Sequence, residues 1–274
     1  MKLFVDNLTV IDCSLLSPEA GLTGMSWMCD IELEGNLDDQ SMVMDFGLVK
    51  KQIKAWIDDG PDHRLVVARG MEGVSITQEN ETHQRLTYKG TVLLTPEQGI
   101  YAIEGAEVTA ENLGVHLSAV ISEHLSEQGI QATIRLRAEE ITGPHYCYSH
   151  GLKKHDGNCQ RIAHGHRSKI EIWQNDALAM ELMQGWATEW QDIYLGSKED
   201  LIEESESHLR FAYEAPQGYF ELTLPHAKCW LLESDSTVEC IASHIAATLK
   251  SQHPDSHFRV KAYEGVQKGA IAEA

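Results

Sequence analysis

The chain repeats itself, and this repeat limits its fold more than any other feature of the sequence. The segment from Leu94 to Leu113 and the segment from Leu222 to Ile241 align without a gap, so that Thr109 stands opposite Thr237. Each segment leads into an amphipathic helix, and each helix is followed by a strand of alternating polar and apolar residues. Upstream strands and helices correspond in the same order, which predicts an internal duplication.

The repeat divides the chain into two domains of ordinary size. The turn-like sequence Thr142-Gly143-Pro144 sets the expected boundary, with domains over residues 1–142 and 143–274. Each half predicts the order strand, strand, helix, hairpin, helix, strand, strand. The expected fold class is therefore α+β, with antiparallel sheets and the helices on one face. In the second half, the first helix is expected to bury the stripe formed by Leu182, Trp186, Trp190 and Ile193.

Charge and composition exclude several classes of function. The chain has 22 Lys and Arg against 42 Asp and Glu, a formal net charge of −20. Because so acidic a surface repels nucleic acid and anionic lipid, we expect neither as a partner. The sequence contains no run of about 18 apolar residues that would predict a membrane helix, and its first residues are not typical of a signal peptide. Six scattered cysteines without a Cys-x-x-Cys pair favour reduced thiols and a cytoplasmic location.

Three histidines of the second half form a candidate metal site. His164 and His166 are two residues apart on a predicted strand, so their imidazoles point to the same face. His150 ends the preceding strand, which would pair antiparallel with this one. Three imidazoles suit Zn²⁺ and leave one coordination position open for a substrate. Cys159, in the intervening loop, is either a fourth ligand or a reactive base; the alternative is a polar turn with a small buried cysteine.

This arrangement resembles the 6-pyruvoyl-tetrahydropterin synthase family, whose bacterial members include the 6-carboxytetrahydropterin synthases of queuosine precursor synthesis. The likeness rests on the histidines and cysteine above and on the segments at 41–63, 108–113 and 236–239. It covers nearly the whole chain as two tandem copies. The resemblance implies two T-fold domains that assemble into a barrel, and a homo-oligomer, either a dimer or a trimer of tandem chains.

Each half lacks what the other half keeps. In the first half, Thr23 and Met25 stand where the family has histidines, and neither residue is a good zinc ligand. The first half retains Asp62-His63, which matches the family's Asp-His pair after the first helix, whereas the second half has no such pair. We therefore expect one composite active site where a second half meets a first half, within the chain or across an oligomer.

The resemblance implies a zinc-dependent lyase acting on 7,8-dihydroneopterin triphosphate. Zn²⁺ held by the three histidines would lower the pKa of the side-chain hydroxyls of the substrate. Cys159 would be the general base, while Asp62 would orient His63 to relay a second proton. The sequence does not decide between a pyruvoyl and a carboxy product.

Other residues are expected to bind the substrate. A strand carboxylate would hold the pterin by two parallel hydrogen bonds. Glu264 is the first choice because it shares a half with the metal site, and Glu140, which the repeat aligns with it, is the reserve. Thr109 matches a family position near the pterin. The basic residues around the metal motif would either receive the triphosphate or form a solvated loop; they are Lys153, Lys154, Arg161 and Arg167.

Two other functions are compatible with the sequence. The chain could be a non-catalytic protein that binds a pterin or purine on the same fold. It could also catalyse another T-fold reaction, such as an aldolase step. Bound zinc together with conversion of the triphosphate would separate the lyase from both.

Overall fold

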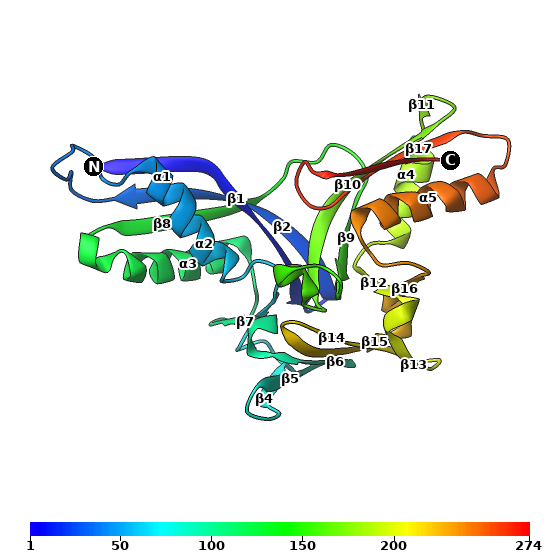
Figure 1. Ribbon diagram of the computed structural model, residues 1–274, viewed down its shortest axis with the longest axis horizontal. Helices are drawn as coiled ribbons and strands as arrows, with labels where there is room; N and C mark the ends of the chain where they lie inside the picture. The colour runs from blue at the N-terminus through cyan, green and yellow to red at the C-terminus, as the bar shows by residue number, and fades with distance from the viewer.

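The computed structural model describes all 274 residues, which form two similar halves joined along a central junction. In Figure 1 the first half extends to one side and the second half to the other, with the two chain ends at opposite extremes. A third sheet lies beneath the junction in this view. None of the helices has both the length and the apolar character needed to cross a membrane.

The first half begins with two long strands and continues through short elements to a long helix and a last strand. Its elements are β1 (Lys2–Ser17), β2 (Gly21–Glu34), α1 (Phe46–Leu48), the π-helical η1 (Val49–Ile53), α2 (Lys54–Asp58), β3 (Leu65–Ala68), β4 (Ser75–Gln78), β5 (His83–Tyr88), β6 (Thr91–Pro96), η2 (Glu97–Gly99), β7 (Ile100–Ile103), α3 (Ala110–His124), η3 (Ser126–Gln128) and β8 (Gln131–Ala138).

The second half repeats this order with two strands after its last helix. Its elements are β9 (His145–His150), η4 (Gly157–Gln160), β10 (His164–Gln174), β11 (Ala177–Leu178), α4 (Met180–Glu189), β12 (Ile193–Ser197), η5 (Lys198–Asp200), β13 (Leu201–Glu204), β14 (His208–Ala215), β15 (Gly218–Pro225), η6 (His226–Lys228), β16 (Cys229–Leu232), α5 (Val238–Gln252), β17 (Phe258–Tyr263) and β18 (Gly269–Glu273).

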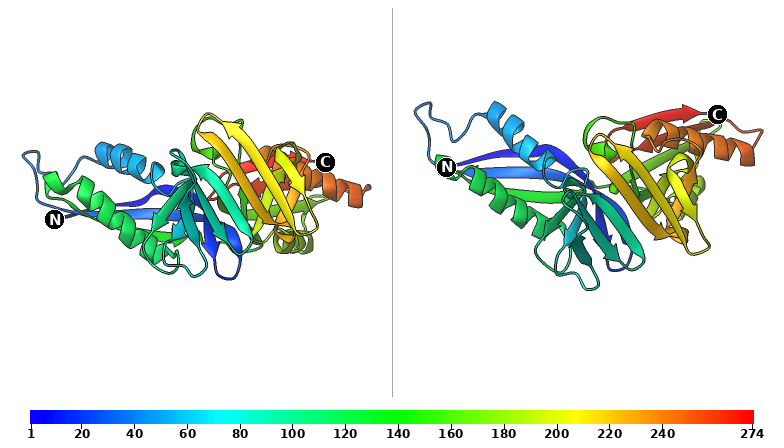
Figure 2. Two further views of the ribbon diagram at one scale, coloured as in Figure 1. Left: turned by 90° about the horizontal axis from the view of Figure 1, so that it is seen from below. Right: turned by 60° about the horizontal axis from the view of Figure 1, so that its bottom comes forward.

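These strands form three sheets, one of which is shared. The first half has the strand order β7-β3-β1-β2-β8, and the second half has β16-β12-β9-β10-β17-β18, with β11 paired to β10. The third sheet, β13-β14-β15-β6-β5-β4, joins three strands from each half through pairing of β15 with β6. Figure 2 shows these two groups of strands side by side. The α+β class is confirmed, although β3, β7, β12 and β16 add parallel pairs to the expected antiparallel sheets.

Alternating apolar residues build one core in each half. In β8, Ala132 and Ile134 are buried between exposed neighbours, as a strand with one face on the core requires. The larger core also takes in Phe211 and Leu222 from the shared sheet, so it extends across the junction. Trp186 and Trp190 of the second half are buried in the smaller core, as the sequence predicts.

An approximate two-fold relation connects the halves at their junction. Residues at equivalent register positions of the two halves meet: the hydroxyl oxygens of Ser14 and Ser149 are 2.7 Å apart. Gly24 and Gly165 lie where β2 crosses β10, and a Cβ on either glycine would collide with the main-chain oxygen of Tyr148. The absence of a side chain at both glycines therefore lets the two halves approach backbone to backbone.

The structure corrects three details of the sequence interpretation. The two turns η2 and η6 follow Pro96 and Pro225, whereas the caps of α3 and α5 are Thr109 and Thr237, so the repeat contains a one-residue shift. The second-half helix stripe stops short of Ile193, because α4 ends at Glu189 and that isoleucine begins β12. The first half has only one strand, β8, after its last helix instead of the expected two, because the next strand along the chain, β9, opens the second half.

Candidate active site at the junction of the halves

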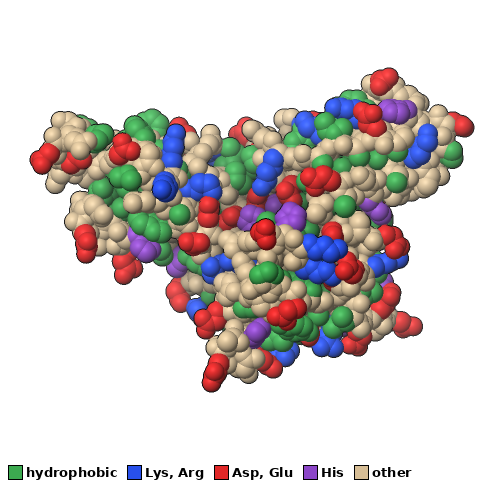
Figure 3. Space-filling view, viewed as in Figure 1, with side chains coloured by type: hydrophobic (Ala, Val, Ile, Leu, Met, Phe, Trp, Pro, Cys, Tyr) green, Lys and Arg blue, Asp and Glu red, His purple; other side chains and the backbone are tan.

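The three predicted histidines converge in the second half beside the junction. His150 ends β9, and it pairs directly with His164 at the start of β10; His166 follows on the same face. At most 1% of each side chain is exposed. The three residues can offer nitrogen atoms that all lie within 4.8 Å of one another, and the Nε2 atoms of His150 and His166 are 3.2 Å apart. Figure 3 shows histidines at the centre of one face, between the halves.

The Nδ1 atom of each ring faces an acceptor, which leaves Nε2 to face the centre of the cluster. His150 Nδ1 donates to the carbonyl oxygen of Ser236 at 2.9 Å, and His164 Nδ1 donates to that of Arg161 at 2.8 Å. His166 Nδ1 lies 3.3 Å from Oδ1 of Asp12, a residue of the first half. Burial and the neighbouring imidazoles hold the pKa of His150 and of His164 well below the ordinary histidine value. The neutral rings and their buried, converging nitrogens fit a divalent cation.

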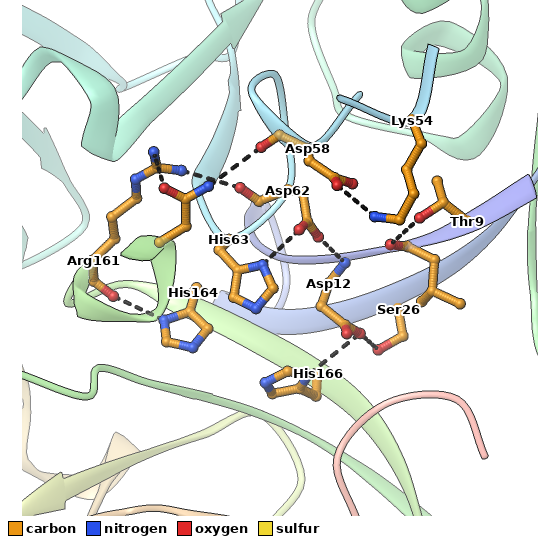
Figure 4. Close-up of polar contacts among 12 residues, drawn as sticks. Thr9, Asp12, Ser26, Lys54, Asp58, Asp62, His63, Arg161, His164 and His166 are labelled. Carbon is orange, nitrogen blue, oxygen red and sulfur yellow. Dashed lines mark hydrogen bonds and ion pairs between the residues drawn. The ribbon is translucent and has the colours of Figure 1, made fainter. Parts of the chain in front are cut away.

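The predicted acid–imidazole pair of the first half lies beside this cluster. Asp62 and His63 sit in the loop between α2 and β3, and Asp62 Oδ2 is 2.7 Å from His63 Nδ1. The His63 ring centroid is 5.1 Å from that of His164. Burial disfavours the imidazolium of His63, but the hydrogen bonds with Asp62 and Cys159 outweigh it and raise the pKa of His63 to about 10. We call Asp62 and His63 the dyad; Figure 4 shows it above the two histidines of β10.

Cys159 is brought to the same point by a loop that binds the first half. Donor atoms of His63, Cys159 and His164 can all lie within 4.8 Å of one another. The residues flanking the thiol hold the loop against the first half: Asn158 donates to the carbonyl oxygen of Asp58 at 3.4 Å, and the buried Arg161 donates to that of Asp62 at 3.1 Å. The thiol, the dyad and the histidine cluster thus meet within one chain.

The candidate substrate residues are more dispersed. Glu264 begins the turn after β17, and the next residue, Gly265, packs against the Asp12 side chain beside His166. Glu140 is exposed beyond β8, and strand register makes Ala138, rather than Glu140, the counterpart of Glu264. Thr109 caps α3 by accepting from the Asn112 N–H at 3.1 Å. Neither Glu140 nor Thr109 contacts the histidine cluster.

The basic residues of the metal motif already have partners. Lys153 pairs with Asp200 at 2.5 Å, and Lys154 pairs with Glu199 at 2.8 Å. Arg161 is buried in the junction, and Arg167 donates to the carbonyl oxygen of Glu139 at 2.8 Å. They therefore stabilise the loop and the junction rather than forming an open cationic surface.

The two-fold relation gives the chain a second, altered copy of the site. By strand register, Leu15, Thr23 and Met25 occupy the positions of the three histidines, and Asp192 occupies that of His63. We call these four residues the degenerate site. His63 and Asp192 both have left-handed backbones, with φ of 53° and 58°. In the degenerate site, however, Asp192 accepts from the Thr23 hydroxyl at 2.5 Å, so a direct hydrogen bond replaces the metal-ligating group.

Sequence analysis missed the acceptors behind the histidines. The carbonyl oxygen of Ser236 has no side-chain signal that could identify it. Asp12 had one: it is a single acid within the buried run from Ile11 to Leu16, and a charge there requires a partner. Burial opposes its ionisation, but His166, Lys268 and the Ser26 hydroxyl hold the pKa of the Asp12 carboxyl well below its usual value.

Comparison with known proteins shows the family of the chain. A sequence model of the family "6-pyruvoyl tetrahydropterin synthase" matches the chain twice, over residues 14–143 and 141–274. A 6-carboxy-5,6,7,8-tetrahydropterin synthase of Rickettsia bellii is 30% identical over 107 residues, which are 39% of this chain and 67% of that protein. The synthase of the same name from Rickettsia typhi is 31% identical over 97 residues, which are 35% of this chain and 59% of that protein.

Solved structures give a weaker likeness. A 6-pyruvoyltetrahydropterin synthase of Plasmodium vivax has a TM-score of 0.39 and 18% identity, over 50% of this chain and 97% of that chain. The corresponding protein of Plasmodium falciparum has a TM-score of 0.38 and 14% identity, over the same shares. The two sequence-model matches together span almost the whole chain. The chain therefore belongs to the 6-pyruvoyl tetrahydropterin synthase family, with two copies of the family domain in tandem.

Proposed function

We propose that the protein is a zinc-dependent lyase that acts on 7,8-dihydroneopterin triphosphate at one composite active site per chain. The observation that carries this proposal is the meeting of Cys159 from the second half with Asp62-His63 from the first half, beside three buried histidines. A non-catalytic pterin binder would not require a thiol and an acid–imidazole pair at the same point. The Rickettsia proteins named above, 6-carboxytetrahydropterin synthases, favour the carboxy product.

His150, His164 and His166 would hold the zinc ion. Three neutral imidazoles are a ligand set typical of catalytic zinc, which keeps one position open. When bound, zinc would supply Lewis-acid chemistry and lower the pKa of the coordinated substrate hydroxyls. The rings of His150 and His164 are already fixed by carbonyl acceptors on Nδ1, so these two ligands need little reorganisation on binding.

The Cys159 thiol and the Asp62-His63 dyad would carry out the proton transfers. Cys159 would remove a proton from the substrate side chain, because its thiol lies beside His164 of the histidine cluster. His63 would relay a second proton. Asp62 would keep the His63 ring in place, because its Oδ2 fixes Nδ1 and leaves Nε2 for the contact with Cys159.

Glu264 is the preferred anchor for the pterin. Its turn packs against Asp12, whose carboxylate faces His166, so a pterin held there would have its side chain near the cluster. Glu140 stays the reserve, but its exposed position beyond β8 provides no comparable route. We keep Thr109 as a substrate-binding candidate only through the family resemblance.

We further propose that the chain works in the cytoplasm as a homo-oligomer. The outer strands β8 and β18 each have one neighbour in their sheets, so each leaves a strand edge that another copy can pair with. Barrel closure through such edges would involve two or three tandem chains.

The first prediction concerns metal content. The purified chain should bind one divalent ion per 274 residues, and His166→Ala should lower its zinc affinity at least about 100-fold because it removes one of three ligands. The matched control is Met25→Ala in the degenerate site, which should leave affinity unchanged. Chelator competition and elemental analysis measure both. Two ions per chain, or full affinity in His166→Ala, would contradict the assignment.

The second prediction separates catalysis from metal binding. His63→Ala should reduce conversion of 7,8-dihydroneopterin triphosphate by about 10²–10⁴-fold, the usual contribution of a positioned acid–base group. Zinc content should stay at the wild-type level, because His63 is not among the three ligands. Asp192→Ala, at the equivalent position of the degenerate site, should retain activity. Loss of zinc or wild-type turnover in His63→Ala would be inconsistent with the proposed role.

The third prediction distinguishes the two candidate anchors. Glu264→Gln should raise KM for the pterin substrate about 10-fold or more, because a charge-assisted pair of hydrogen bonds is lost. Glu140→Gln should leave KM unchanged. Steady-state kinetics with analysis of the product test both variants. A raised KM in Glu140→Gln with an unchanged KM in Glu264→Gln would show that the pterin binds at the first-half sheet instead.

A further inference from the structure

Asp12 is the point at which the two halves of the candidate site are connected. Its side chain is 2% exposed although it lies on a strand of the half that has no metal ligands. Oδ1 lies 3.3 Å from His166 Nδ1 and also accepts a hydrogen bond from the Ser26 hydroxyl at 2.5 Å. Oδ2 accepts from Lys268 Nζ at 3.1 Å. Two further groups, Ser26 and Lys268, thus fix the carboxylate that faces the metal ligand. Figure 4 shows Asp12 between Ser26 and His166.

The main chain of the same residue holds the catalytic dyad. The Asp12 N–H donates to Asp62 Oδ1 at 2.8 Å, while the other oxygen of Asp62 faces His63. The Asp12 carbonyl oxygen accepts from the His63 N–H at 2.7 Å. This second bond holds His63 in its left-handed backbone conformation, with φ of 53°.

His166 differs from the other two histidines in the nature of its acceptor. His150 and His164 donate from Nδ1 to carbonyl oxygens of their own half. His166 Nδ1 has no hydrogen-bonding acceptor of good geometry, and the group it faces is the Asp12 carboxylate. A carboxylate behind a ligating imidazole fixes its orientation and increases its basicity, which strengthens metal binding.

The degenerate site separates the two roles of Asp12. Its counterpart there is Cys147, whose carbonyl oxygen accepts from the Asp192 N–H at 2.8 Å. The main-chain bond is therefore present at both positions and belongs to the docking of the halves. The carboxylate is present only where a histidine, rather than Met25, needs an acceptor. The packing of the two halves against each other therefore does not explain why residue 12 carries a carboxylate.

We infer that Asp12 is a positioning residue that aligns the metal ligand His166 through its side chain and the Asp62-His63 dyad through its main chain. This inference rests on the proposed metal site. It assigns to the half without ligands an indirect part in metal binding, through the orientation of His166. The metal ligand and the dyad then depend on the same residue of β1, so a shift of this strand would displace both.

The test is Asp12→Asn, which keeps the main-chain bonds and the side-chain size but removes the charge. We expect zinc affinity, measured by chelator competition, to fall about 10–100-fold, the usual effect of losing such a partner. The unfolding transition of the metal-free protein should change much less than the affinity. The matched control is Asp192→Asn, which removes a carboxylate from the same junction at the degenerate site and should leave affinity unchanged.

A second variant keeps the inference testable if Asp12→Asn does not fold. Ser26→Ala leaves the carboxylate in place but removes the hydroxyl that fixes Oδ1, so zinc affinity should fall in the same direction by a smaller factor. Wild-type affinity in the folded variants would overturn the inference. If His166→Ala loses zinc while Asp12→Asn does not, the proposed metal site stands and only the role of Asp12 is wrong. If the wild-type chain binds no zinc, the proposed function itself fails.

Discussion

The close backbone contact between β2 and β10 is the constraint on which the rest of the structure depends. Gly24 and Gly165 have no side chains where the two sheets cross, and the hydroxyl groups of Ser14 and Ser149 meet beside them. At this separation the loop after α2 reaches the histidine cluster of the other half. A larger residue at either glycine would push the sheets apart, and the dyad would move away from the thiol.

The same approximate symmetry explains why the chain has one site with metal ligands and catalytic groups and one equivalent site without them. Duplication supplied two equivalent positions at one junction, and the residues now divide unequally between them. One position has three histidines, a thiol and an acid–imidazole pair, whereas the degenerate site is closed by the hydrogen bond between Thr23 and Asp192. Buried histidines without a metal are costly. In the degenerate site Leu15, Thr23 and Met25 replace them, and these side chains are poor ligands for zinc.

Much of this was predictable from sequence, because the determining patterns are local. The repeat, the metal motif and the amphipathic helices follow from spacing, and the missing histidines of the first half predicted a composite site. The parallel strands β3, β7, β12 and β16 were not predictable, since four- or five-residue strands carry little periodicity. The register of the strands could not be predicted from the sequence either. Only the observed strand pairing shows that Ala138 corresponds to Glu264. Only the structure shows that Asp12 faces His166, which lies 154 positions later in the chain.

The central claim is that each chain completes its own active site, and co-expression of two inactive variants tests it most directly. One chain would carry His63→Ala and the other Cys159→Ala, with different tags so that mixed oligomers can be isolated. Because the dyad and the thiol meet within one chain, the mixed oligomer should be inactive, while a wild-type chain paired with a doubly substituted chain should retain the activity of one site. Recovery of activity in the mixture of single variants would show that the working site forms between chains and would contradict the account.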